Sequence, residues 1–214
     1  NKYLVVRDNT PMLYGQFVVA AQNHVGSLID VNVLVQDRVG PSLGKLLAEL
    51  CTDASSWNHG NALQVVKHWR NTFVLTDKLS ECRSLGWAND FHTGNLCVSL
   101  CGGRMVWCDW EVVGADSGPV HSIKTALKKL KKSFLDIEGL SHSWKEFHEH
   151  LFSTLHNSLN RASPETYLGC WRPIVDQVLT EYGPPSIVTN NWISAEADVP
   201  SLDVGASGVI LPAN

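Results

Sequence analysis

The stretch that decides the fold reads Asn89-Asp90-Phe91-His92-Thr93-Gly94-Asn95-Leu96-Cys97-Val98 and continues five residues later as Arg104-Met105-Val106-Trp107-Cys108-Asp109-Trp110-Glu111. Two short apolar runs, 96–100 and 105–108, flank Gly102 and Gly103, which is a β-hairpin pattern. In an antiparallel hairpin the start of the first strand lies opposite the end of the second. The sequence therefore predicts that Asp90, Asn95 and Asp109 lie together at one end of the hairpin.

Carboxylate and carboxamide oxygens gathered in one place suit magnesium chemistry. Mg²⁺ is a hard cation that is usually held by one or two carboxylates together with phosphate oxygens. A carboxylate that does not bind the metal is then able to orient a hydroxyl nucleophile. The three side chains therefore favour phosphoryl transfer.

The spacing Asp-x-x-x-x-Asn, followed by a hairpin and a second Asp, resembles the catalytic core of the protein-kinase-like superfamily. Within this superfamily the motifs look closest to those of the aminoglycoside phosphotransferase and choline kinase branch, on the evidence of residues 90–95 and of Asp109-Trp110-Glu111. This resemblance implies a kinase that uses ATP and Mg²⁺ to phosphorylate a hydroxyl acceptor, with a small molecule favoured over a protein. It also implies that Asp90 orients the acceptor and accepts its proton, while Asn95 and Asp109 hold the metal. His92 and Glu111 are second choices, for acceptor-side or loop-supporting roles.

The resemblance extends upstream of the hairpin. Residues 10–15 look like the entry to the fourth strand of a kinase small lobe, and residues 33–40 look like the fifth strand running into the hinge. In the family the adenine pairs with hinge backbone, which implies a nucleotide contact at Gln36, Asp37, Arg38 and Val39. The expected fold class is α+β: a mainly helical large lobe over 41–214, with an irregular tail at 186–214, and residual small-lobe strands and hinge over 1–40.

About a dozen residues precede the expected fourth strand, too few for three strands and a helix of ordinary length. We therefore expect a truncated small lobe in this chain, whose partner would be the missing segment of the same polypeptide. The isolated chain is then expected to be inactive, to bind nucleotide weakly, and to expose apolar surface around Tyr3, Phe17 and Val19.

Three departures from the family pattern bear on activity. Ala88 stands where protein kinases have a His, so support for the loop must come from elsewhere, from Trp87 or His92. The chain has no glycine-rich loop followed by a strand Lys, which keeps open a catalytically inactive pseudokinase that acts as a binding or scaffold module. Pro119 and a new helix follow Asp109 too soon for a protein-kinase activation segment, which favours a small-molecule acceptor. An unrelated α+β interaction domain is the third class, if the motif match is accidental.

Composition narrows the remaining classes. The 214 residues contain 17 Lys and Arg against 21 Asp and Glu, a formal net charge of −4, which argues against general nucleic-acid binding. No apolar run is long enough for a membrane span or a signal peptide, so the compartment stays open and the cytoplasm is weakly favoured. Cys97, Cys101 and Cys108 are expected to be free thiols on the paired strands. Five tryptophans are expected in core or inter-helix packing: Trp69, Trp87, Trp107, Trp144 and Trp171.

Apolar periodicity predicts the other elements. We expect strands at 17–21 and 31–36, a helix capped by Ser42, a helix over 61–79, and an amphipathic helix after Pro119. Five lysines of the last helix are expected to form a solvated face: Lys124, Lys128, Lys129, Lys131 and Lys132.

The C-terminal third is predicted from capping and breaking signals. Residues 143–146 form a capping box that would open a helix, and residues 163–165 would start another segment, which Pro173 breaks or kinks and Gly183 ends. Four histidines in this region, His142, His148, His150 and His156, are expected at the surface rather than in a metal site.

Overall fold

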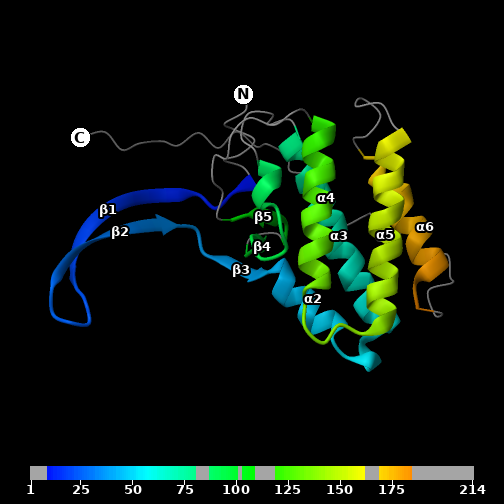
Figure 1. Cartoon of the computed structure of the whole chain (residues 1–214), viewed down its shortest axis with the longest axis horizontal. Coiled ribbons are helices and arrows are strands. Elements are labelled where there is room, and N and C mark those ends of the chain that lie inside the picture. Colours follow the sequence, from blue (N-terminus) through cyan, green and yellow to red (C-terminus); the bar gives the residue numbers. More distant parts are fainter. Residues whose placement is uncertain (1–8, 81–86, 101–102, 109–118, 162–168, 185–214) are drawn as a thin grey trace, which may run out of the picture.

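The structure is a computed structural model that describes residues 9–80, 87–100, 103–108, 119–161 and 169–184. Over these residues the chain is an α+β protein, as expected, with a helical body, a small three-stranded sheet beside it and a two-stranded ribbon that extends away from both (Figure 1). None of the helices in the described part is long and apolar enough to cross a membrane.

The ribbon is formed by β1 (Leu13–Gln22) and β2 (Leu28–Gln36), which pair antiparallel. Its register places Phe17 opposite Val33 and Val19 opposite Val31, so one face of the ribbon is apolar. Phe17 is 50% exposed and Val19 is 46% exposed, which confirms the expected apolar surface at these two residues. Tyr3, which was expected to share that surface, lies outside the described residues.

The second sheet has the order β3-β4-β5, with β3 at Val39–Ser42, β4 at Leu96–Ser99 and β5 at Met105–Trp107. Strand β4 pairs antiparallel with β5, which confirms the predicted hairpin. The strand expected at 31–36 is confirmed by β2, which ends at Gln36. The chain leaves the ribbon at Asp37 and Arg38, and β3 then pairs with β4 in the second sheet.

The helices before the hairpin confirm the sequence prediction. Helix α2 (Leu43–Cys51) begins after Ser42, whose hydroxyl accepts a hydrogen bond from Lys45 N and caps the first turn. Helix α3 spans His59–Ser80. Two short 3₁₀ helices complete this part, η1 at Ala54–Ser56 and η2 at Trp87–Asp90.

Three further helices complete the body: α4 (Pro119–Leu135), α5 (His142–Arg161) and α6 (Trp171–Tyr182). The capping-box expectation is wrong, because α5 already begins at His142 and Ser143 lies inside its first turn. The expectation that Pro173 breaks a helix is also wrong. Pro173 lies in the first turn of α6, where a backbone N–H would have no intrahelical partner. Gly183 ends α6 as predicted, and residues 163–165 lie outside the described part.

The core lies among these helices, and the five tryptophans predicted to pack are all buried in it. The expectation of surface histidines is wrong for His148, which is completely buried. Its Nε2 accepts a hydrogen bond from Trp69 Nε1 at 2.7 Å, and its Nδ1 lies 2.7 Å from Trp144 O. Its ring stacks on Phe134 with 3.6 Å between ring centroids, and burial lowers its pKa to about 3.

The cysteines described are free thiols, as expected for Cys97, which is buried, and Cys108, which is half-buried. Cys101 lies outside the described residues, so its expected state stays a prediction.

Candidate active site

The structure brings two of the three predicted catalytic residues into contact. Asp90 ends the short helix η2, and Asn95 precedes β4. The Asn95 amide nitrogen donates to the Asp90 carboxylate at 2.5 Å and lies 3.3 Å from the Asp90 backbone oxygen. The Asp90 side chain is 38% exposed, so an acceptor molecule has access to it.

The orientation of the Asn95 amide fits a cation site. Because two oxygens of Asp90 surround the NH₂ group, the amide oxygen Oδ1 is directed to other partners. Within the described residues this oxygen accepts no hydrogen bond. It is a hard, neutral donor of the kind that Mg²⁺ accepts, and the neighbouring carboxylate supplies negative charge. The residues present therefore fit the metal that the sequence implies.

His92 supports Asp90 from within the same loop. Its Nδ1 accepts a hydrogen bond from Gly94 N at 3.1 Å, so in the neutral imidazole the proton is on Nε2. This Nε2 lies 3.5 Å from an Asp90 carboxylate oxygen. A Cβ at position 94 would lie 3.0 Å from His92 Cε1, which explains why a glycine fits there.

Buried side chains anchor the loop that carries Asp90 to the core. Ala88, at the position where protein kinases have a His, is 1% exposed, and Trp87 packs edge to face on Phe91 with 5.0 Å between ring centroids. The sequence left open whether Trp87 or His92 supports the loop that carries Asp90, and in the structure both residues contact it. Trp87 fixes the backbone through the core, and His92 contacts the Asp90 carboxylate.

Three neighbouring elements anchor the same loop through its backbone. The first turn of α2 donates Gly44 N to Thr93 O at 2.9 Å, and Thr93 N donates to the Ser133 hydroxyl of α4 at 3.1 Å. The end of the hairpin donates Cys108 N to Asn95 O at 2.7 Å. Sequence reasoning missed Gly44 and Ser133, because a contact between a loop and a distant helix leaves no periodic signal.

Asp109, with Trp110 and Glu111, lies outside the described residues, so its assignment as catalytic residue and metal ligand stays a prediction. The last described residue before it, Cys108, lies at the Asn95 end of the hairpin, one position beyond the pair formed by Leu96 and Trp107. No cluster of three His, Cys, Asp or Glu side chains able to hold a metal occurs within the described ranges.

The predicted nucleotide contact falls on the link between the ribbon and the second sheet. Asp37 has a bracing role there. Its N–H donates to Met12 O at 2.9 Å, and its carboxylate accepts from Met12 N at 3.0 Å and from the Tyr14 hydroxyl at 2.5 Å. These bonds, the Tyr14 bond first, hold the pKa of Asp37 below its usual range.

Because Asp37 N–H is already bonded, a nucleotide contact would use other backbone groups between Gln36 and Val39. Gln36 and Arg38 are exposed, and Val39 is half-buried in β3. The assignment of Gln36, Asp37, Arg38 and Val39 to adenine binding stays a prediction.

Comparisons with known proteins give one likeness to report. No protein-family model matches the chain, and no curated protein matches it. Among solved structures the chain is similar to the crystal structure of the Legionella pneumophila LegK7 effector kinase, with 14% sequence identity and a TM-score of 0.42. The match covers 85% of this chain and 51% of that kinase, so the chain spans about half of its length. The function of this protein is therefore inferred from its own residues.

Proposed function

We propose that the protein is an ATP-dependent phosphotransferase with a hydroxyl group as acceptor. The observation that carries the proposal is the hydrogen bond from Asn95 to Asp90, which leaves the Asn95 amide oxygen for a cation and keeps the Asp90 carboxylate accessible. This division of the two side chains is what phosphoryl transfer requires, since one group must hold Mg²⁺ and another must orient the attacking hydroxyl.

In this proposal Asp90 accepts a hydrogen bond from the acceptor hydroxyl and takes its proton as the bond from the hydroxyl oxygen to the γ-phosphorus forms. The bond between that phosphorus and the bridging oxygen breaks, and ADP is the leaving group. Asn95 and Asp109 hold Mg²⁺, which, when bound with ATP, neutralises charge on the phosphates. The Nε2 of His92, 3.5 Å from the Asp90 carboxylate, helps to keep Asp90 in position. Catalysis of this kind depends on positioning and charge neutralisation, and the anchored loop is suited to both.

We propose a small molecule as the acceptor, in line with the resemblance to the aminoglycoside and choline kinases. Only residues 110–118 separate Asp109 from α4, which begins at Pro119. In protein kinases this part of the chain is a long segment that binds the peptide substrate. The short connection therefore favours a small acceptor over a peptide.

The second candidate is a pseudokinase that binds without transferring phosphate. The observation that favours it is Ala88, a buried residue at the position where protein kinases have a His.

Two variants of the protein test the proposal. Asp90→Asn is expected to lower turnover at least about 100-fold while nucleotide affinity changes less than about 3-fold, because Asp90 acts on the acceptor. Asp109→Asn is expected to weaken Mg²⁺-dependent ATP binding itself. Phosphate transfer to a panel of hydroxyl compounds and calorimetric ATP binding are the measurements. Equal losses of ATP affinity in the two variants would refute the division of roles, and binding without any turnover would favour the pseudokinase.

A further inference from the structure

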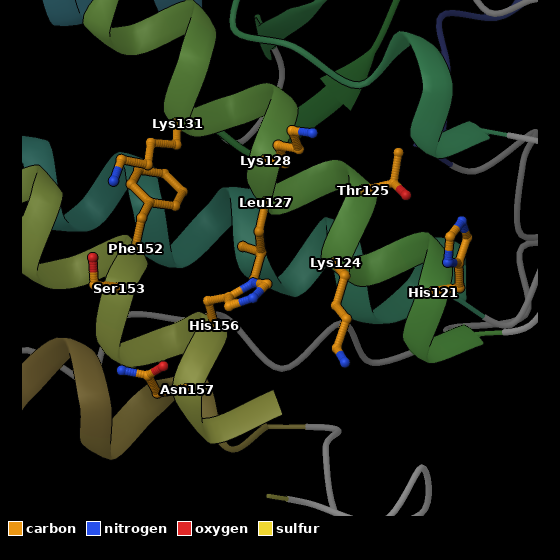
Figure 2. Close-up of a pocket in the computed structure, with 10 residues that line it drawn as sticks. All are labelled: His121, Lys124, Thr125, Leu127, Lys128, Lys131, Phe152, Ser153, His156 and Asn157. Atoms are coloured by element: carbon orange, nitrogen blue, oxygen red, sulfur yellow. The ribbon is translucent and has the colours of Figure 1, made fainter. Parts of the chain in front are cut away.

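A groove between α4 and α5 lies apart from the residues of the candidate active site. It has a volume of about 650 Å³, which is in the usual range for small-molecule sites. Leu127 of α4 and Phe152 of α5, both buried, form its floor. Figure 2 shows Leu127 pointing from α4 toward His156 of α5.

The wall that α4 contributes is basic. Lys124, Lys128 and Lys131 line the groove and share one side of the helix, since they are four and three residues apart. No Asp or Glu is among the described residues that line it. Nor does any of these lysines form an ion pair within the described part of the chain. By contrast, Lys132 lies 3.3 Å from Asp136 on another side of the helix.

Burial distinguishes two of the groove lysines from the other lysines of α4. Lys124 and Lys131 are half-buried, whereas Lys128, which also lines the groove, is exposed like Lys129 and Lys132. The expectation that all five lysines form a solvated face is therefore wrong for Lys124 and Lys131. Since neither ammonium group has an ion-pair partner among the described residues, an anion in the groove would give both of them one.

We propose that this groove binds a soluble small molecule that carries at least two phosphate groups. Lys124 and Lys131 are two helical turns apart, about 10 Å along the axis, so a single compact anion cannot contact both ends equally. Separate phosphate groups on one molecule match this spacing. His156, with neighbouring polar side chains of α5, offers further hydrogen bonds on the opposite wall. The concave shape favours a small molecule over a flat membrane surface.

The formal net charge of −4 makes the proposal specific to this groove, because the chain as a whole does not attract anions. The proposal is also independent of the proposed phosphotransferase activity, since the argument uses none of the residues assigned to it. Each can therefore fail without the other.

The test is calorimetric titration of the protein with inositol hexakisphosphate in buffer of fixed ionic strength. We expect one molecule to bind per chain. The double variant Lys124→Gln/Lys131→Gln should weaken binding at least about 10-fold, as expected for loss of two charge-assisted contacts. The control Lys129→Gln/Lys132→Gln removes the same charge from the same helix and should change affinity less than about 2-fold.

Three results would overturn the proposal. The first is no binding to the wild-type protein, and the second is equal weakening in the two double variants, which would indicate non-specific attraction. The third is loss of binding in Asn95→Ala, which would place the ligand at the candidate active site. Vesicles of phosphatidylcholine and phosphatidylserine serve as a further arm. If these bind through Lys124 and Lys131 while inositol hexakisphosphate does not, the surface recognises lipid and the proposal is wrong.

Discussion

Replacing His148 with Gln is expected to make the stability of the fold less sensitive to acid. The imidazole is fully buried, and burial lowers its pKa to about 3 from an ordinary value of 6.5. At pH 5 the folded protein therefore keeps His148 neutral, whereas the unfolded chain protonates it. Because the unfolded state binds more protons between about pH 6.5 and pH 3, the free energy of unfolding falls as the pH is lowered through this window.

The magnitude follows from these two pKa values. Between pH 7 and pH 5, protonation stabilises an unfolded imidazole by about 2 kcal/mol, while the folded state gains almost nothing. At pH 7 His148→Gln should cost about 1–3 kcal/mol, because the amide replaces only one of the two buried hydrogen bonds, to Trp69 or to Trp144. At pH 5 the wild-type protein has lost the further 2 kcal/mol and the variant has not, so the difference between them should nearly vanish or reverse.

Urea unfolding at pH 7 and pH 5, followed by tryptophan fluorescence, measures both free energies. The matched control is His156→Gln, since His156 is exposed and its replacement should shift stability little at either pH. The reasoning is refuted if the difference between wild type and His148→Gln is the same at the two pH values, because His148 would then titrate alike in the folded and unfolded states.

Two further variants test the loop and a buried carboxylate. Gly94→Ala places a methyl group about 3 Å from the His92 ring and should lower the proposed phosphotransferase turnover about 10-fold through displacement of Asp90, with the melting temperature nearly kept. An unchanged kcat would contradict this expectation. Burial raises the pKa of Asp77 despite the hydrogen bond from Trp171, so Asp77→Asn should raise the melting temperature at pH 7. The gain should shrink as the pH is lowered and the wild-type carboxyl becomes protonated, and a gain independent of pH in calorimetric scans would count against the raised pKa.

The elements predicted well from sequence are those with a strong local signal. The hairpin has a glycine turn between apolar runs, and α2 has Ser42 as its cap, so neither depends on distant contacts. The contact between Asp90 and Asn95 was predictable for the same reason, since five residues and one turn determine it. The hydrogen bond from Thr93 N to the Ser133 hydroxyl was not predictable, because it depends on the tertiary packing of α4 against the loop.

The burial of His148 was missed because the spacing of the histidines was given more weight than the apolar period of the helix. Four histidines at nearly regular spacing suggested a polar surface, yet His148 also lies four residues after Trp144 and three before Leu151, both of them buried. This position belongs to the apolar stripe of α5, and helical periodicity alone would have placed it inside. The groove between α4 and α5, by contrast, was not predictable from helical periodicity. The period of α4 shows which lysines share a face, but it does not show which helix lies opposite that face.

The loop that carries Asp90 is held by parts of the chain that take no part in the proposed chemistry. Helix α2 bonds it through Gly44, α4 through Ser133, and the hairpin through Cys108, while Phe91 fixes it in the core. Since each bond fixes a different backbone group, the carboxylate is oriented before any ligand arrives, and less ordering remains to be done on binding. Helix α4 also carries the groove lysines, which lie before Ser133 in the sequence. One rigid helix therefore contributes both to the anchored loop and to the proposed anion site.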